Sequence, residues 1–140
     1  MEWTISTDPA LVQLELVHGW LARSYWSPNI RRDVFATAFA NSLVAGAYAG
    51  SRQLGVARVV TDQATFAWLA DVYVADDVRG RGIARALVRT LMEDPRTQTL
   101  RRWLLGTRDA HGVYSALGFS AVDPTVFMQH SPDPARWTAV

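Results

Sequence analysis

Residues 71–87, DVYVADDVRGRGIARAL, constrain the fold of this chain more than any other stretch. The pattern predicts the end of an apolar strand, a short polar turn and the start of a helix. The first turn of a helix has backbone N–H groups without helical partners, and the helix dipole favours an anion there. Gly80 and Gly82 lack a Cβ, so a phosphate can approach the backbone closely. Fixed positive charge surrounds the same turn, from Arg79, Arg81 and Arg85.

Two common phosphate-binding motifs fit this turn less well. A P-loop needs a lysine followed by serine or threonine after its second glycine, whereas this chain has Ile83 and Ala84 there. A dinucleotide-binding fingerprint needs a third spaced glycine, which is missing. What remains is the pattern Arg-x-x-Gly-x-Ala, residues 79–84, directly after an apolar strand.

Composition narrows the class of protein. A chain of 140 residues predicts one domain, residues 1–140, and its 49% hydrophobic and 19% charged residues are typical of a soluble globular protein. Fourteen basic against 13 acidic residues give no basic field for nucleic acid. There is no cysteine and no histidine pair with metal-ligand spacing, so we expect no metal site. The N-terminus lacks the basic start of a signal peptide, which favours a cytoplasmic protein without membrane contact.

Hydrophobic periodicity and turn residues predict a mixed α/β order of elements. The expected helices cover residues 15–24, 31–41, 81–93 and 110–117. The expected strands cover residues 2–6, 42–49, 53–61, 65–74 and 102–106, with a closing hairpin over residues 119–122 and 125–128. This order implies a mixed sheet with helices on its faces.

The turn and this order of elements resemble the Gcn5-related N-acetyltransferase (GNAT) family. Residues 79–84 are similar to the family's motif A, Gln/Arg-x-x-Gly-x-Gly/Ala. Residues 110–119, AHGVYSALGF, resemble its Ala-x-x-Leu/Val-Tyr-x-x-Leu-Gly-Phe signature. The resemblance implies the GNAT fold, an α/β fold with a central, mostly antiparallel mixed sheet, a splayed strand pair and helices on both faces.

The resemblance also implies acetyl-CoA as the cofactor, with its pyrophosphate on the glycine turn and its pantetheine arm along the preceding strand. The expected cofactor-binding residues are Val72, Tyr73, Val74, Arg79, Gly80, Arg81, Gly82, Ile83, Ala84, Arg85, Thr107, Ala110 and Tyr114. Thr107 departs from the family pattern, because many relatives have an asparagine seven residues before the tyrosine. A solvated helix face is the alternative for the arginines, and it suits Arg89 better than Arg81.

Two residues are candidates for catalysis. Tyr114 aligns with the tyrosine that protonates the departing thiolate in many family members, and the alternative is a packed core tyrosine. Asp71 interrupts an apolar strand, where burial without a partner would raise its pKa toward the range of a base. The alternative is a structural aspartate bonded to backbone or arginine. Asp62 and Glu15 are other possible bases, and Tyr25 with Trp26 can wall an acceptor pocket.

The sequence therefore predicts an acetyl-CoA-dependent N-acetyltransferase that uses direct attack in a ternary complex. The acceptor would be a primary amine of a small molecule or peptide. A non-catalytic acyl-CoA-binding module of the same fold is the alternative from another class. No nucleic acid or membrane partner is expected, and a homodimer remains open.

Overall fold

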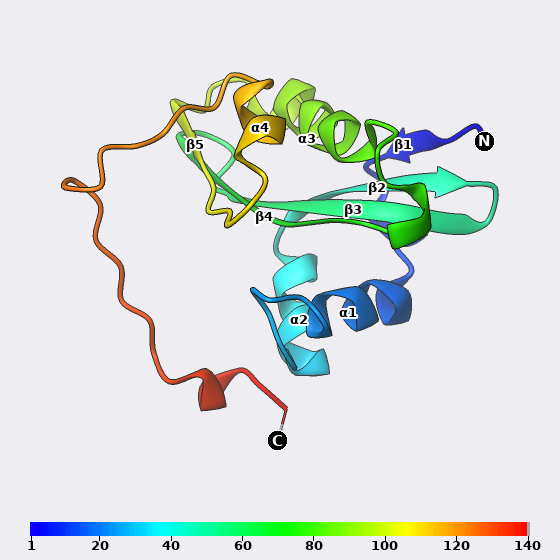
Figure 1. Cartoon of the computed structure of the whole chain (residues 1–140), viewed down its shortest axis with the longest axis horizontal. Coiled ribbons are helices and arrows are strands. Elements are labelled where there is room, and N and C mark those ends of the chain that lie inside the picture. Colours follow the sequence, from blue (N-terminus) through cyan, green and yellow to red (C-terminus); the bar gives the residue numbers. More distant parts are fainter. Residues whose placement is uncertain (140) are drawn as a thin grey trace.

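A five-stranded mixed sheet organises the computed structural model, which describes residues 1–139 (Figure 1). The strands lie in chain order as β1 (Thr4–Ser6), β2 (Leu43–Ala49), β3 (Arg52–Thr61), β4 (Phe66–Val74) and β5 (Arg102–Leu104). Strands β1 to β4 pair with one another in antiparallel fashion, whereas β5 pairs in parallel with β4. The expected mostly antiparallel mixed sheet is confirmed.

Helices cover both faces of the sheet. Helices α1 (Leu14–Ala22) and α2 (Arg32–Ala40) lie on one face, and α3 (Ile83–Glu93) lies on the other (Figure 1). The short α4 (His111–Ser115) follows β5 on the α3 side. Pro95 cannot continue α3, and the side chain of Asp94 caps the 3-10 turn that follows. Among residues 1–139, no helix is long and apolar enough to span a membrane.

The three longer helices, α1, α2 and α3, bury apolar side chains against the sheet. The α3 stripe is fully covered and comprises Ile83, Leu87, Val88 and Leu91. It can lie this close to β3 because residue 55 is a glycine: a Cβ there would meet the side chains of Ile83 and Leu87 at 3.3 Å. On the other face, Phe35 and Phe39 of α2 pack with ring centroids 4.5 Å apart. Each such aromatic or aliphatic side chain contributes about 1.5–3 kcal/mol on burial.

A bulge in β4 redirects the strand at Asp71. Val56 pairs with Tyr73 and Arg58 pairs with Ala70, so two residues of β4 oppose one residue of β3. Asp71 adopts the left-handed backbone conformation, with φ of 55°. Bulges increase local twist and bend the strand. Pairing of β4 with β5 ends at Trp68 and Leu104, so the two strands are splayed beyond that point, as predicted.

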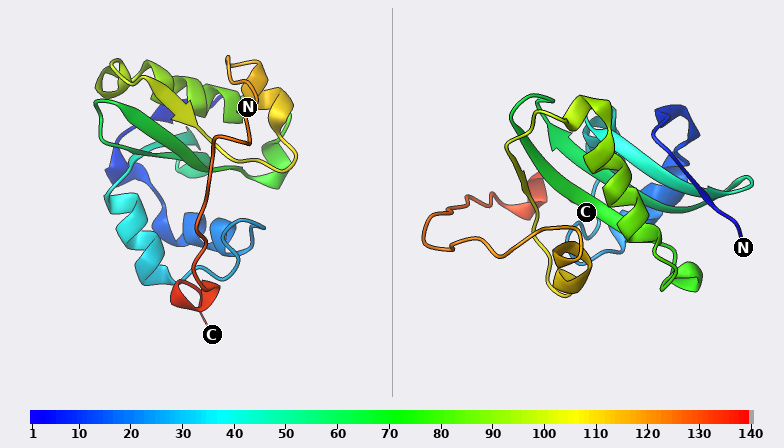
Figure 2. Two further views of the ribbon diagram at one scale, coloured as in Figure 1. Left: turned by 90° about the vertical axis from the view of Figure 1, so that its left-hand side faces the viewer. Right: turned by 90° about the horizontal axis from the view of Figure 1, so that it is seen from above.

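The predicted closing hairpin over residues 119–122 and 125–128 is wrong. These residues form no strand; they begin an extended segment that leaves α4 and returns to the α1–α2 side (Figure 2). Pro124 would occupy the second turn position, where its fixed φ is incompatible with the positive φ of a type I′ hairpin turn. Instead, the Asp123 carboxylate accepts a hydrogen bond of 2.9 Å from the Thr125 N–H and closes a local turn.

Candidate active site

A cleft of about 790 Å³ opens where β4 and β5 diverge. Four parts of the chain form its walls: the end of β4, the glycine turn with the start of α3, the start of α4, and the loop between α1 and α2. Among the expected cofactor-binding residues, the cleft brings together Val72, Tyr73, Val74, Arg79, Gly80, Gly82, Ile83, Ala84, Arg85, Ala110 and Tyr114. Arg81 and Thr107 do not line it.

The glycine turn presents open backbone to the cleft. Gly80 and Gly82 have φ values of 80° and 79°, a conformation that glycine adopts without a steric penalty. A Cβ added to either glycine would have no neighbour within 4 Å, so the space above the turn is free. Gly82 caps α3, and its carbonyl accepts the N–H of Ala86 at 3.0 Å. The backbone N–H groups of residues 83–85, which lie between Gly82 and Ala86, therefore have no helical partner and can bind an anion.

The arginines of the turn differ in their roles. Nε of Arg79 donates to the Val74 carbonyl at 3.0 Å, and its guanidinium pairs with Asp76 at 2.9 Å. The same guanidinium lies 5.4 Å from the centre of the Tyr73 ring. Arg79 thus fastens the turn to the end of β4. Arg85 lines the cleft, whereas Arg81 is exposed outside it.

The β4 wall has one free backbone edge. Along residues 72–74, β4 is hydrogen-bonded to β3 only, because its pairing with β5 has already ended. Such an edge can accept an extended ligand that carries amide groups. Tyr73 is held in this wall by stacking on Trp20 of α1, with ring centroids 5.1 Å apart.

Tyr114 lies in the opposite wall, on α4. It is half-buried, and its ring packs edge-on against Phe119 with centroids 6.0 Å apart. Burial raises the pKa of the Tyr114 phenol, and the neighbouring Tyr25 raises it further. A phenol with a raised pKa keeps its proton throughout the neutral range, so Tyr114 can act as a donor but not as a base.

Asp71 is buried, with 9% of its surface exposed, and both of its carboxylate oxygens have partners. One accepts from Nε of Arg58 at 2.7 Å, and the other accepts from the indole N–H of Trp26 at 2.9 Å. Arg58 also donates to the Ser42 hydroxyl at 3.1 Å. The arginine partner is the structural alternative that the sequence left open. Opposite charges in two adjacent apolar strands were the sequence signal for this pair.

The loop between α1 and α2 bridges the two walls of the cleft. Trp26 is tied to β4 through Asp71, while the Tyr25 hydroxyl accepts the backbone N–H of Arg108 at 3.0 Å. The Arg108 guanidinium lies 3.8 Å from the centre of the Tyr25 ring. Sequence reasoning named the two aromatic residues but missed Arg108, whose role depends on a contact between distant segments.

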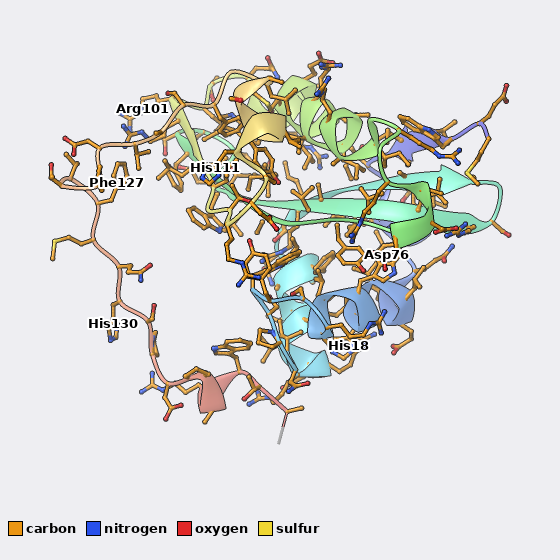
Figure 3. The ribbon with its side chains drawn as sticks, viewed as in Figure 1. His18, Asp76, Arg101, His111, Phe127 and His130 are labelled. Carbon is orange, nitrogen blue, oxygen red and sulfur yellow. The ribbon has the colours of Figure 1, made fainter. Side chains whose placement is uncertain are left out.

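Thr107 has a local role instead of a contact in the cleft. Its hydroxyl oxygen accepts the Ala110 N–H at 3.1 Å and so supports the start of α4. The histidines are dispersed over the molecule (Figure 3). His18 bonds the Ile30 carbonyl at 2.8 Å, His111 begins α4, and His130 lies on the C-terminal extended segment.

Comparison with known proteins agrees with this geometry. The model of the acetyltransferase (GNAT) family matches residues 10–119. The chain belongs to the GNAT acetyltransferase family. A GNAT-family protein of Xanthomonas campestris pv. campestris, provisionally described as an acetyltransferase, has a crystal structure that is 37% identical in sequence. The match covers 94% of each chain with a TM-score of 0.90.

Two further proteins are similar to this chain. A protein of Gibberella zeae, provisionally described as an acetyltransferase, is 28% identical over an alignment length of 129, and the match covers 77% of this chain and 73% of the relative. An acetyltransferase-like protein of Clostridium acetobutylicum was crystallised with acetyl-CoA. It is 15% identical, covers 93% of this chain and 95% of its own, and has a TM-score of 0.68, which shows a shared fold.

Proposed function

We propose that this GNAT protein transfers the acetyl group of acetyl-CoA to a primary amine of a small molecule or peptide by direct attack in a ternary complex. One observation carries the proposal: the open glycine turn, the free edge of β4 and the Tyr114 phenol all face one cleft. An anion site, an amide-binding edge and a proton donor in one cleft are the three features that such a transfer needs.

The residues present fit acetyl-CoA, which would bring an activated thioester to the cleft. The free N–H groups at the start of α3 would hold the diphosphate, and the positive charge of Arg85 lies beside them. Val72, Tyr73 and Val74 would offer the unpaired edge of β4 to the pantetheine amides. The side chain of Arg79 already bonds the Val74 carbonyl, so it shields the last position of this edge.

Tyr114 holds the proton that a leaving sulfur requires. An unperturbed phenol has a pKa near 10 and a thiol near 8.5, so the transfer is uphill by about 2 kcal/mol even before the phenol pKa is raised. Positioning must offset this cost. Tyr114 is positioned by its packing against Phe119, while Tyr25 lines the same cleft.

Asp71 is the residue that we propose to accept the proton of the attacking amine. An amine attacks only as the free base, so its proton must pass to a protein group or to water. Asp71 shares a face of β4 with Tyr73, because both contact residues from the α1 side of the sheet. Its hydrogen bonds from Arg58 and Trp26 take one acceptor position on each oxygen, which leaves a second position on each for a proton or a water.

These contacts also favour a second candidate function, an acyl-CoA-binding module without turnover. Both oxygens of the Asp71 carboxylate accept hydrogen bonds from the protein itself, and this arrangement is typical of a residue that stabilises the structure. Steady-state release of free CoA on a panel of amines separates the two functions. The chain has no cysteine, so a thiol reagent would detect only the released CoA. Amine-dependent turnover supports the enzyme, whereas saturable CoA binding without thiol release supports the module.

A further inference from the structure

Three arginines line the cleft, namely Arg23, Arg79 and Arg85. Arg79 pairs with Asp76 and fastens the glycine turn to β4, and Arg85 lies beside the N–H groups at the start of α3. Arg23, which directly follows α1, is the third. Among residues 1–139 its exposed side chain has no ion-pair or hydrogen-bond partner, so the guanidinium is free to bind a ligand.

Arg23 differs in this respect from the other two arginines of the segment that comprises α1, α2 and the loop between them. Arg31 pairs with Asp33 at 3.0 Å, and Arg32 pairs with Glu15 at 2.8 Å. A guanidinium stays charged at physiological pH, and its planar set of N–H donors matches the oxygens of a carboxylate or a phosphate. An unpaired arginine in the wall of a cleft is therefore a binding group for an anion.

The end of α1 positions the Arg23 guanidinium. A Cβ at Gly19 would meet Nη1 of Arg23 at 3.3 Å, so the side chain folds back over the turn of α1 that contains this glycine. Trp20, the next residue of α1, stacks on Tyr73 of β4 with ring centroids 5.1 Å apart. Helix α1 therefore supplies both the ring that supports the β4 wall and a cation on the same side of the cleft.

Arg23 and Arg85 belong to opposite faces of the sheet. Arg23 follows α1, whereas Arg85 is part of α3, and these two helices cover different faces (Figure 1). The proposed diphosphate site lies at the start of α3, beside Arg85. Asp71, the proposed proton acceptor, is bonded to Trp26, which lies in the same loop as Arg23. Arg23 is therefore on the acceptor side of the cleft.

We propose, on the basis of the acetyl transfer described above, that Arg23 binds an anionic group of the acceptor, either a carboxylate or a phosphate. The acceptors are then primary amines that also carry such a group. The opposite wall matches the other end of such a molecule, because Asp109 lines the cleft there and is exposed without an ion-pair partner among residues 1–139. These two free charges of opposite sign suit an ammonium group and an anion on one molecule.

Matched amine pairs test the proposal, with CoA release as the readout. β-Alanine is compared with β-alaninamide, and O-phosphoethanolamine with ethanolamine, so each pair differs in the anion and keeps the amine. We expect at least one anionic amine to exceed its neutral partner about tenfold or more in kcat/KM, and R23Q to abolish this preference. R89Q is the matched control, because Arg89 is an exposed arginine of α3 outside the cleft, and it should keep the preference. Turnover without a preference for the anionic members, or a preference that survives R23Q, overturns the proposal.

A binding titration covers the case in which no amine of the panel is acetylated. The protein saturated with CoA is titrated with β-alanine and with O-phosphoethanolamine. Wild type and R89Q should bind at least one of them about tenfold or more tightly than R23Q does, and all three proteins should bind CoA equally within about twofold. Absent or equal binding of both amines overturns the proposal, as does weaker CoA binding by R23Q, which would assign Arg23 to a cofactor phosphate. Amine binding that depends on Arg23 without any turnover contradicts the proposed transfer and leaves the anion site standing.

Discussion

The indole N–H of Trp26 donates to Oδ1 of Asp71 at 2.9 Å, and this contact joins the α1–α2 loop to the bulge of β4. The same carboxylate pairs with Arg58 at 2.7 Å, and both side chains of the pair are largely buried. One aspartate therefore connects β3, β4 and the loop that bridges the cleft. Asp71 can therefore affect folding, the position of the loop and proton transfer. Substitutions of Asp71 and Trp26 separate these three effects.

We expect Asp71→Asn to lower the free energy of unfolding by about 3 kcal/mol, because it leaves the Arg58 guanidinium buried without a counter-charge. It should also lower kcat/KM for an amine acceptor while acetyl-CoA binding is retained. Chemical denaturation and kinetics on the same preparation measure both. If Asp71 is the titrating base, the acidic limb of the pH–rate profile disappears in this variant.

Trp26→Phe is the control for Asp71→Asn, since it keeps the ion pair and removes the indole donor together with part of the ring that packs on Tyr25. Its stability loss should be about 1 kcal/mol. Wild-type stability and kinetics in Asp71→Asn would contradict the assignment, and a water chain or another carboxylate such as Asp62 or Glu15 would then be the base.

Tyr114→Phe removes the phenolic proton and keeps the ring. We expect kcat to fall roughly 10- to 1000-fold, the range of general acid catalysis or just below it, with little change in cofactor affinity. The pKa of Tyr114 is raised above its usual value near 10. Any loss of wild-type activity that begins below pH 10 in the pH–rate profile should therefore not come from ionisation of this phenol. Full activity in the variant would make Tyr114 a packing residue.

Tyr48 offers a test of stability away from the cleft. Its hydroxyl is buried and has no hydrogen-bond partner within residues 1–139, and burial raises its pKa, with the charge of Asp8 adding to the effect. A raised pKa means that the folded state favours the protonated phenol more than the unfolded state does. This difference contributes to the free energy of unfolding below about pH 10, and the contribution is lost as the pH rises through the folded pKa. Tyr48→Phe should raise the free energy of unfolding by about 1 kcal/mol at pH 7 and reduce the alkaline loss. A destabilised variant would contradict the unpaired hydroxyl.

Thr107→Val tests the position that departs from the family pattern. The hydroxyl oxygen supports the first turn of α4, so its removal should cost about 1 kcal/mol of stability and lower Tm by several degrees. Because Thr107 does not line the cleft, the Kd for acetyl-CoA should stay within about twofold, which is less than about 0.5 kcal/mol. A tenfold weaker Kd in a variant with unchanged CoA-free stability would place this side chain in the cofactor site.

Local patterns predicted most of the frame of the site. The apolar run of β4, the two glycines and the stripe of α3 each depend on residues close in the sequence, and the structure places them as expected. The partners of Asp71 were open because Trp26 and Arg58 come from separate segments. The C-terminal hairpin failed for a related reason: alternating side chains form a strand only beside a pairing partner, and Pro124 excludes the tight turn that would supply one.

Binding of acetyl-CoA to the glycine turn is the central claim, and calorimetric titration of wild type, Gly82→Glu and Gly50→Glu tests it most directly. Both glycines have positive φ, 79° and 58°, with no neighbour that a Cβ would meet within 4 Å, so both variants carry similar backbone strain. Only Gly82→Glu puts a negative charge where the diphosphate would lie. We predict saturable binding to wild type and Gly50→Glu, and at least tenfold weaker binding to Gly82→Glu, a loss of about 1.4 kcal/mol or more. Equal affinity in all three folded proteins would contradict the account.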